Sequence, residues 1–254
     1  MARRRFFSPP ESFAADGSSL ELRKEEARHL RDVLRLVLGD EVFVFDGEGK
    51  EFRCQVEEFG RDTALLEITS EVEPARPESL LKLTIAVALL KGEKLDLVVQ
   101  KVTELGATRI VPIVSKLADV RLRDEADGQK RVVRLRRIAL EACKQSGRAR
   151  IPEIAAPIAF NALIEGGSSV GDEWRVIFSE RNGRTLSDVI ESMSTSPKAV
   201  TALVGSEGGW TDEELATARS TGWDIVTLGG RIVRAETAAI AVTALIQHLF
   251  GDLR

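Results

Sequence analysis

The most informative segments of the sequence are ALVGSEGGWTDEE, residues 202–214, and LGGRIVRAETAAI, residues 228–240. In both stretches a short apolar run ends in glycines, carries charged residues among or just after them, and leads into a helical pattern. Glycine at the carboxyl end of a buried strand lets backbone N–H groups approach a ligand, because no Cβ stands in the way. Two such turns, close in sequence, predict one pocket built from adjacent loops. Either turn taken alone is equally typical of a plain chain reversal.

Outward from these turns, apolar runs alternate with helical patterns from residue 80 onward. The runs that predict strands are residues 83–90, 109–114, 174–178, 200–204 and 224–228. The patterns that predict helices are residues 93–105, 130–145, 211–222 and 236–250. The third of these helices opens with a capping box formed by Thr211 and Glu214. Strands that alternate with helices predict an α/β domain with a mostly parallel sheet, covered on both faces.

The first 70 residues have a different pattern of apolar and polar residues, which predicts a small β-rich domain with one short helix. Residues 42–59 alternate apolar and polar side chains on both sides of the turn 46–49, which is typical of a β-hairpin. Residues 64–69 predict a further strand. A helix is expected to end at Gly39. Its expected apolar face consists of Leu30, Val33, Leu34 and Val37.

Residues 70–79, SEVEPARPES, are polar, contain two prolines and lack apolar periodicity, which is typical of a linker. At 254 residues the chain is long enough for two domains, each with its own core. We therefore expect a first domain over residues 1–72, a linker over residues 73–79 and a second domain over residues 80–254.

The composition, with 43% hydrophobic residues, 30% charged residues and a net charge of −4, is typical of a soluble globular protein. Cys54 and Cys143 lie far apart and only two histidines are present, so we expect neither a disulfide framework nor a metal site. The apolar run at residues 238–250 is too short to span a bilayer, and the amino-terminal residues lack the apolar segment of a secretory signal. We therefore expect a cytoplasmic protein that acts away from membranes.

Positive charge is concentrated in two regions of the chain. Residues 116–150 hold 11 Lys and Arg against five Asp and Glu, a local balance of +6, and Arg3, Arg4 and Arg5 are consecutive. Local rather than total charge governs contact with phosphates, so both regions are candidates for binding a polyanion. The alternative is a solvated helix face and a frayed amino terminus.

The first glycine turn, Gly205 to Gly209, is neither a G-x-G-x-x-G sequence nor a lysine-containing phosphate loop. Dinucleotide or triphosphate binding therefore has no motif support. Glu207, which lies among glycines, suits a ligand that bears hydroxyls or positive charge. Trp210 is expected to pack as a hydrophobic staple at the helix entry, with covering of a ligand as the alternative.

The second glycine turn, residues 228–233, places Arg234 and Glu236 just before an alanine-rich helix. Arginine at such a junction suits a phosphate, a carboxylate or a base edge. Glu236 near a helix start is also explained by the helix macrodipole. Ser-His-Asp catalysis lacks support, because His29 and His248 fall on expected helices and no nucleophile elbow is present.

A third cluster, EACKQSGR at residues 141–148, closes the basic helix. Gln145 and Arg148 are placed to reach a nucleotide. A plain helix end at Gly147 explains the same spacing equally well.

Several of these segments match one known family. The most specific are Gly205-x-Glu207-Gly208-Gly209 and Leu228-Gly229 followed by Arg234-x-Glu236-Thr237-Ala238. Weaker matches are RRFF at 4–7, HLRDVLR at 29–35, GD at 39–40, KG at 91–92, KVTELG at 101–106, Pro112, EA at 141–142, QSGR at 145–148 and PE at 152–153. Over most of its length the chain thus resembles the bacterial 16S ribosomal RNA uridine N3-methyltransferases of the RsmE type, in the SPOUT superfamily.

The chain departs from this family's pattern at a few positions. Ser206 stands where proline is usual, Lys144 where an acidic residue is common, and Ala235 where threonine is usual. Residues 117–119, Leu-Ala-Asp, replace a Glu-Arg-Ser-like stretch. The glycines, Arg234 and Glu236 are retained.

The resemblance implies a PUA-like RNA-binding β-barrel domain, followed by a parallel-sheet methyltransferase domain with a deep trefoil knot. It also implies a homodimer, S-adenosylmethionine as cofactor, and 16S rRNA of the small ribosomal subunit as substrate. Two alternatives stay open: a SPOUT ribose 2′-O-methyltransferase with another rRNA or tRNA target, and a non-catalytic RNA-binding assembly factor. The identity of the modified nucleotide, the catalytic base, and the choice between free rRNA and assembled subunit as substrate also stay open.

From the resemblance we expect the two glycine turns to hold the cofactor, with Leu203 and Leu228 beside the adenine. The expected cofactor-binding residues are Leu203, Val204, Gly205, Ser206, Glu207, Gly208, Gly209, Leu228, Gly229, Ile232, Val233 and Arg234. Arg234 is the first candidate for catalysis, as a stabiliser of negative charge on the uridine, and Glu236 is the second, as a base or as the residue that orients Arg234. The expected RNA contacts are Arg3, Arg4, Arg5, His29, Arg31, Arg35, Arg134, Arg137, Gln145 and Arg148.

Overall fold

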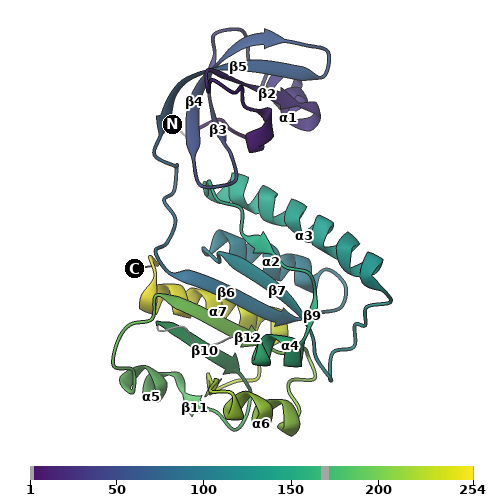
Figure 1. Cartoon of the computed structure of the whole chain (residues 1–254), viewed down its shortest axis with the longest axis vertical. Coiled ribbons are helices and arrows are strands. Elements are labelled where there is room, and N and C mark those ends of the chain that lie inside the picture. The colour runs from purple at the N-terminus through teal and green to yellow at the C-terminus, as the bar shows by residue number, and fades with distance from the viewer. Residues whose placement is uncertain (1–2, 167–171, 254) are drawn as a thin grey trace. The chain divides into compact units, whose positions relative to one another are not determined.

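The computed structural model describes residues 3–166 and 172–253 (Figure 1). Contacts within the fold divide the chain into two compact units. The first unit is Met1–Glu78 with Leu140–Ile151, and the second unit is Ser79–Ala139 with Pro152–Arg254. Residues 140–151, which fall within the expected second domain, therefore group with the first unit.

The first unit is built on a five-stranded mixed sheet in the order β1-β3-β4-β5-β2. Its strands are β1 (Arg5–Phe7), β2 (Ser19–Arg23), β3 (Glu41–Phe45), β4 (Glu51–Phe59) and β5 (Thr63–Val72). β1 pairs with β3 in parallel and the other pairs are antiparallel, so the expected β3–β4 hairpin is confirmed. The helical segments are η1 (Pro10–Ser12), α1 (Lys24–Arg28) and η2 (His29–Val33).

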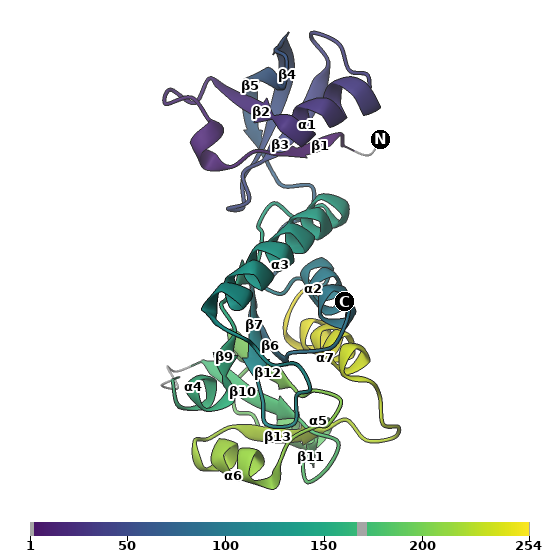
Figure 2. The ribbon, with the colours of Figure 1, turned by 90° about the vertical axis from the view of Figure 1, so that its right-hand side faces the viewer.

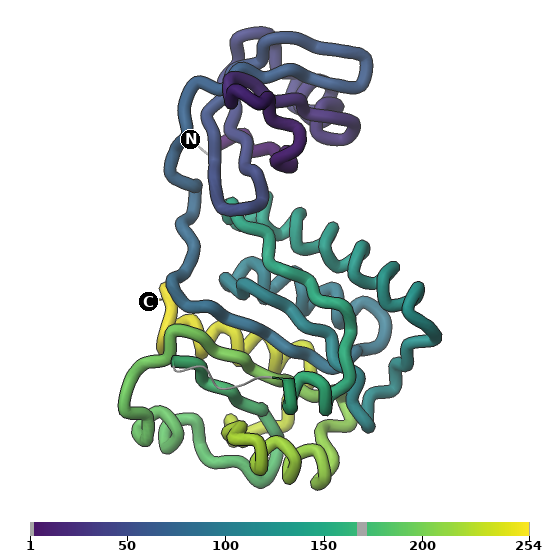
Figure 3. Tube along the Cα trace, viewed as in Figure 1, coloured from purple at the N-terminus to yellow at the C-terminus, as the bar shows by residue number. Residues whose placement is uncertain are grey.

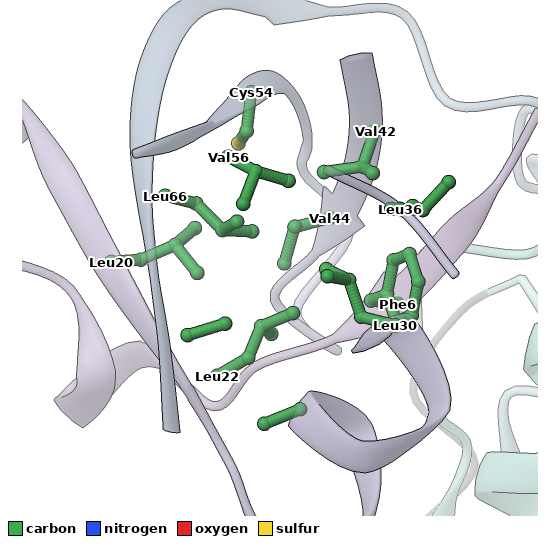
Figure 4. Packing of buried hydrophobic residues seen from close by; sticks show 12 residues of the cluster. Phe6, Leu20, Leu22, Leu30, Leu36, Val42, Val44, Cys54, Val56 and Leu66 are labelled. Atoms are coloured by element: carbon green, nitrogen blue, oxygen red, sulfur yellow. The ribbon is translucent and has the colours of Figure 1, made fainter. Parts of the chain in front are cut away.

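The core of the first unit lies on the inner face of this sheet (Figure 4). Successive side chains of a strand point to opposite faces, so Cys54 and Val56 of β4 are buried while Gln55 between them faces outward. A register shift between Arg53 and Cys54 interrupts this alternation toward the start of the strand. Phe6, Leu20, Leu30 and Leu66 are fully or almost fully buried, and they meet in one cluster. An apolar interior on one face of the sheet agrees with the alternating pattern of residues 42–59.

One expectation for the first unit is wrong. The predicted helix to Gly39 ends at Val33, after a single π-helical turn in which the N–H of Leu34 donates to His29 O. Arg35 then adopts a left-handed backbone (φ 53°), so helical spacing no longer applies beyond this point. Val33 is 68% exposed, and Leu34 and Val37 are exposed as well, whereas the chain beyond the helix buries Leu36.

The second unit is built on an eight-stranded sheet in which every pairing is parallel. The strand order is β11-β13-β10-β12-β6-β7-β8, with β9 also paired to β7. The strands are β6 (Lys82–Ala88), β7 (Arg109–Val114), β8 (Glu153–Ile154), β9 (Ile158–Ala159), β10 (Glu173–Phe178), β11 (Arg184–Thr185), β12 (Ala199–Val204) and β13 (Asp224–Thr227). The central strands are buried on both faces, which explains their uninterrupted apolar sequences.

Helices cover both faces of the parallel sheet. α2 (Lys94–Glu104) and α7 (Ala235–Phe250) pack together on one face, and α4 (Phe160–Glu165) and α6 (Asp212–Ser220) lie on the other (Figure 2). α5 (Leu186–Glu191) contacts β11 and β13, and α3 (Glu125–Ser146) is the long basic helix. α6 starts with the expected capping box: Thr211 Oγ1 accepts from Glu214 N, and the Glu214 carboxylate accepts from Thr211 N.

Candidate functional site: a pocket at the carboxyl ends of three strands

The carboxyl ends of β12, β10 and β13 surround a pocket of about 460 Å³. Its lining consists of Phe178, Ser179, Glu180, Val204, Gly205, Ser206, Glu207, Gly209, Trp210, Thr227, Leu228, Gly229, Gly230, Arg231, Ile232, Val233, Arg234, Ala235 and Ala238. Both glycine turns therefore line one pocket, as predicted. Their strands are not neighbours, however: β10 lies between β12 and β13, and its loop supplies the third wall.

Trp210 forms the floor of the pocket and packs in the core at the same time. The side chain is only 3% exposed, its Nε1–H donates to Phe178 O at 3.0 Å, and its ring lies 5.3 Å from the Phe160 ring. A Cβ on Gly205 would stand 3.1 Å from the Trp210 ring, so the first glycine turn passes directly over the indole. The turn closes through Gly209 N–H, which donates to Ser206 O at 2.9 Å, with Gly209 at φ 67°.

Hydrogen bonds tie the loop after β10 to residues that flank the two glycine turns. Arg181 Nη2 donates to Trp210 O at 3.1 Å, and Arg181 Nη1 lies 3.2 Å from the Asp212 carboxylate. On the other side, Gly183 N–H donates to Thr227 Oγ1 at 3.1 Å. The loop after β10 thus connects the segment that follows the first glycine turn to the end of β13.

The second glycine turn forms the exposed side of the pocket. Gly229 and Gly230 both have positive φ, 74° and 73°, and no atom lies within 4 Å of where their Cβ atoms would be. Backbone conformation rather than space therefore requires glycine here. Ile232 is 86% exposed. The chain then enters α7, the yellow helical trace of Figure 3. Arg234 is the N-cap residue of this helix.

Charged side chains of the lining lie on the exposed side, away from the Trp210 floor. Lys94 Nζ binds the Glu207 carboxylate at 2.7 Å, and this hydrogen bond holds the pKa of Glu207 below its ordinary value. Glu180, Arg231 and Arg234 form no ion pair or side-chain hydrogen bond with any other residue that the structure describes. These three charged groups are therefore available to a ligand.

Gly208 faces away from the pocket lining. A Cβ there would lie 2.9 Å from Leu117 O, so the glycine lets the segment 116–119 pack on the back of the turn. That segment is held in place by Lys116 N–H, which donates to Glu214 Oε1 at 3.0 Å. Asp119 pairs with Lys91 at 2.9 Å. The stretch that departs from the family pattern thus supports the first glycine turn from behind.

Most of the expected cofactor-binding residues lie in the lining, and two do not. Leu203 is fully buried in the core beneath the pocket, and Gly208 contacts the segment 116–119. Gly230 and Arg231 lie in the second glycine turn, which was expected to hold the cofactor, and Trp210 lines the pocket as the alternative for that residue had it. The lining residues that sequence reasoning missed are Phe178, Ser179, Glu180, Thr227, Ala235 and Ala238. The signal for Glu180 was present, since it follows the strand predicted at residues 174–178 and carboxyl ends of parallel strands share one edge.

Glu236 lies outside the lining, in the first turn of α7, where its charge interacts favourably with the macrodipole. Its Oε2 atom is buried and has no hydrogen-bond partner within the described chain. Ser206 Oγ, in the first glycine turn, is buried and unpartnered in the same sense. Buried polar atoms normally have partners, so both oxygens are open to a hydrogen bond from a ligand or after local rearrangement.

The expected RNA contacts fall into two classes. Arg5 pairs with the fully buried Glu51 at 3.1 Å, and Arg148 pairs with Glu78 at 2.6 Å and is itself buried. The guanidinium groups of Arg3, Arg31 and Arg134 also bind protein carboxylates. The expected contacts whose side chains are exposed and without an ion pair among the described residues are Arg4, His29, Arg35, Arg137 and Gln145. Arg5 and Arg148 therefore hold the first unit together rather than presenting free charge.

Within residues 3–166 and 172–253, no group of three or more His, Cys, Asp and Glu side chains lies close enough to hold a metal ion. Over the same residues, no helix combines the length and apolarity needed to cross a membrane. Burial raises the pKa of the Cys54 and Cys143 thiols to about 12, so neither is a ready nucleophile.

Comparison with known proteins identifies the family. Residues 77–247 match the model of the RNA methyltransferase domain, and residues 22–69 match that of the RNA methyltransferase PUA domain. Ribosomal RNA small subunit methyltransferase E of Synechocystis sp. is 33% identical over 250 residues, covering 98% of this chain and 78% of the relative. The Bacillus subtilis protein of that name is 32% identical over 238 residues, covering 91% and 90%.

Two solved structures share the whole fold. Ribosomal RNA small subunit methyltransferase E from Neisseria gonorrhoeae, bound to S-adenosyl methionine, superposes with a TM-score of 0.86 at 32% identity, covering all of both chains. A putative methyltransferase from Legionella pneumophila, in complex with the same cofactor, gives 0.86 at 31% identity, again over all of both chains. The expected fold class, a PUA-like domain followed by a SPOUT-type methyltransferase domain, is confirmed. This chain therefore belongs to the family of the ribosomal RNA small subunit methyltransferases E.

Proposed function

We propose that this protein transfers a methyl group from S-adenosylmethionine to N3 of a uridine in 16S rRNA of the small ribosomal subunit. Relatives that match almost the whole chain are named as methyltransferases of that subunit's RNA, and two similar structures hold the cofactor. The observation that carries the proposal is the pocket itself. It gathers both glycine turns at the carboxyl edge of a parallel sheet, where ligands of such folds bind.

The residues of the pocket fit this cofactor. The apolar floor, with Trp210, Phe178 and Val204, suits a flat adenine ring, and the glycine turns leave backbone groups uncovered by side chains. The unpartnered Ser206 Oγ adds a hydrogen-bonding group beside the floor. The proposed cofactor-binding residues are Val204, Gly205, Ser206, Glu207, Gly209, Leu228, Gly229, Ile232, Val233 and Arg234, with Leu203 supporting them from the core.

When bound, S-adenosylmethionine supplies an electrophilic methyl group on a sulfonium. The protein's part is to position the uridine and to favour loss of its N3 proton, because the neutral imide is a poor nucleophile. Arg234 suits this role: it lines the pocket, is exposed, and has no ion-pair partner among the described residues. Its guanidinium would stabilise the negative charge that develops on the uridine carbonyl oxygens.

Glu236 is the second catalytic candidate. No ion pair joins it to Arg234 in the described structure, so its role as a base has more support than its role in orienting the arginine. As a base it would need to turn its carboxylate toward the pocket.

N3 lies on the Watson–Crick edge, so the target base must be unpaired or extruded before it reacts. We assign the grip on the surrounding RNA to Arg4, His29, Arg35, Arg137 and Gln145, whose side chains are exposed. Arg3, Arg31 and Arg134 would contribute only if they exchange a protein carboxylate for a phosphate.

Further properties belong to the same proposal. A trefoil knot follows from the family resemblance. The domain boundaries at residues 72 and 80, a cytoplasmic location and a metal-independent reaction follow from the sequence. A homodimer has additional support from exposed leucines on two helices that pack together, namely Leu97 on α2 and Leu245 and Leu249 on α7. Light scattering coupled to gel filtration tests the dimer, and methylation in the presence of EDTA tests the metal.

The central experiment compares 16S rRNA from a strain with and without this gene. Mass spectrometry of digested rRNA is expected to show one N3-methyluridine that disappears with the gene, and primer extension locates it. A methyl group lost from a ribose oxygen would identify a 2′-O-methyltransferase instead. Failure of the purified protein to bind S-adenosylmethionine in calorimetry would point to a non-catalytic RNA-binding protein.

The role of Arg234 is tested by Arg234→Ala in single-turnover methylation with saturating cofactor. We expect the rate to fall on the order of 100-fold, as when one oxyanion-stabilising group is removed. Lys198→Ala, which removes an exposed charge at the opposite end of β12, is the control. An unchanged rate for Arg234→Ala would remove this residue from the mechanism.

A further inference from the structure

Glu180 is a charged residue of the pocket lining. It lies in the loop after β10, the middle of the three strands whose ends form the pocket. Its carboxylate reaches over the first glycine turn: a Cβ on Gly209 would lie 3.5 Å from Glu180 Oε1. The carboxylate thus lies beside the Gly205–Gly209 turn.

The charges of the lining single out Glu180. The charged lining residues are Glu180, Glu207, Arg231 and Arg234. Glu207 is already neutralised by Lys94 at 2.7 Å, and the two arginines repel a cation. Glu180 has neither an ion pair nor a side-chain hydrogen bond among the residues that the structure describes. It is therefore the carboxylate of this lining that remains free to pair with positive charge in a ligand.

The polarity of the pocket indicates which part of a ligand this carboxylate meets. Trp210, Phe178 and Val204 are buried at the floor, whereas Glu180 and the arginines are exposed at the rim. A ligand with a flat base and a charged tail would place the base on the floor and the tail at the rim. The charged centre that follows the nucleoside in S-adenosylmethionine is the sulfonium.

We propose that Glu180 recognises the sulfonium charge, and so makes the pocket prefer the methyl donor over the spent product; this inference rests on the proposed function. S-Adenosylhomocysteine keeps the adenine, ribose and amino-acid groups of the donor and lacks only the methyl group and the positive charge on sulfur. A carboxylate beside the sulfur attracts the donor and has no such attraction for the product. Glu180 is a specificity residue for the donor.

The experiment is calorimetric titration of the full-length protein with each ligand separately. Glu180→Gln keeps the shape of the side chain and removes its charge. We expect S-adenosylmethionine to bind about fivefold more weakly to this variant and S-adenosylhomocysteine to bind unchanged, the size being that of a partly exposed ion pair. Glu180→Lys is expected to weaken donor binding further. Glu191→Gln, an exposed carboxylate at the end of α5 outside the lining, is the matched control and should alter neither affinity.

The outcomes separate the possibilities. Equal weakening of both ligands would mean that Glu180 binds the ribose or the amino group, and would overturn the proposal. Unchanged affinity for both would overturn it too. If the unaltered protein bound neither ligand, the proposed function itself would fail, which is a different result from a variant without effect. Circular dichroism of each variant confirms that the fold is retained.

Discussion

Gly205 illustrates how a single missing side chain sets the shape of the pocket. Its Cα passes so close to the indole of Trp210 that a methyl group would stand 3.1 Å from one ring atom and 3.2 Å from another. The ring has little freedom to retreat, because its N–H is bonded to Phe178 O and its face packs on Phe160. Gly205 is needed because its backbone lies so close to the Trp210 ring, whereas Gly229 and Gly230 are needed because their φ angles are positive.

Gly205→Ala is therefore expected to destabilise the protein by about 1–3 kcal/mol, as overpacking does, and to weaken cofactor binding because the turn must move. Denaturant unfolding and calorimetry measure the two effects. The matched control is Gly128→Ala in α3, where the new Cβ would lie 3.7 Å from Pro157. That change should be neutral or stabilise by up to about 1 kcal/mol, since alanine is the better helix former. Equal behaviour of the two variants would contradict the packing argument.

The Lys94–Glu207 pair gives a pH dependence whose sign follows from the direction of the pKa shift. The hydrogen bond from Lys94 lowers the pKa of Glu207 from 4.5, so the folded state binds its proton less readily than the unfolded chain does. The pair stabilises the protein fully above pH 4.5, and this contribution is lost as the pH falls through the lowered pKa. Both side chains are about one-third exposed, so the effect is small.

We predict that Lys94→Met is less stable than the unaltered protein by at most about 1 kcal/mol at pH 7. The difference should shrink as the pH falls below 4.5. Thermal unfolding across this pH range measures it. A difference that stayed constant down to pH 3 would show that Lys94 acts through packing rather than through charge.

Among the helices, the start of α6 depends on the Glu214 carboxylate, which accepts two backbone hydrogen bonds. Glu214 is almost fully buried; its Oε2 accepts from Thr211 N at 2.9 Å and its Oε1 accepts from Lys116 N at 3.0 Å. The first bond closes the capping box and the second anchors the segment 116–119 behind Gly208. The start of one helix and the rear of the glycine turn thus depend on the same side chain.

Glu214→Gln is expected to cost about 1–3 kcal/mol, because the amide offers only one oxygen for two backbone donors. Glu213→Gln, in the same helical turn but with a side chain that is 77% exposed, is the control and should cost less than about 1 kcal/mol. Denaturant unfolding measures both. Similar values for the two variants would mean that the buried bonds to Glu214 add nothing to an ordinary surface contact.

Local pattern predicted the elements that are long and strongly apolar. The runs at residues 83–90 and 109–114 became β6 and β7 within two residues at either end, because a strand buried on both faces leaves an unmistakable sequence. The short elements β8, β9, β11, α4 and α5 were missed, since two to six residues carry no usable periodicity. The helix to Gly39 was wrong because a π turn and a left-handed Arg35 interrupt it.

The pocket was predicted in part for a similar reason. The sequence shows that strands end in glycines, but it does not show that β10 inserts between β12 and β13, because strand order is a property of long-range packing. The loop with Glu180 was missed on that account. The knot and the domain boundaries remain predictions.

At the scale of the whole molecule, positive charge in the sequence is not the same as positive charge available to RNA. Glu51 is fully buried and binds both Arg3 and Arg5, and Arg148 is buried against Glu78. Removing one partner of such a pair leaves an uncompensated buried charge. Replacement of Arg5 or Arg148 is therefore expected to affect folding, whereas replacement of exposed arginines is expected to affect RNA binding.

Replacing Arg4, Arg35 and Arg137 together with Gln is expected to weaken RNA binding and to reduce the slope of log affinity against log salt by about two to three. Filter binding at several salt concentrations measures that slope. The control changes Lys82 and Lys198 to Gln, two exposed residues at the amino ends of β6 and β12, and should leave the slope unchanged. Equal slopes for the two sets would show that RNA approaches another face.

The position of β10 between the two glycine-ending strands has a consequence for how the protein responds to its ligand. Any molecule seated in the pocket touches chain segments that begin near residues 178, 204 and 227, far apart in sequence. A bound ligand therefore contacts three separate segments of the chain and stabilises them together. The free energy of binding therefore raises the free energy of local unfolding along this edge of the sheet. Without a ligand, the loops of the pocket are expected to unfold locally more readily than the rest of the second unit.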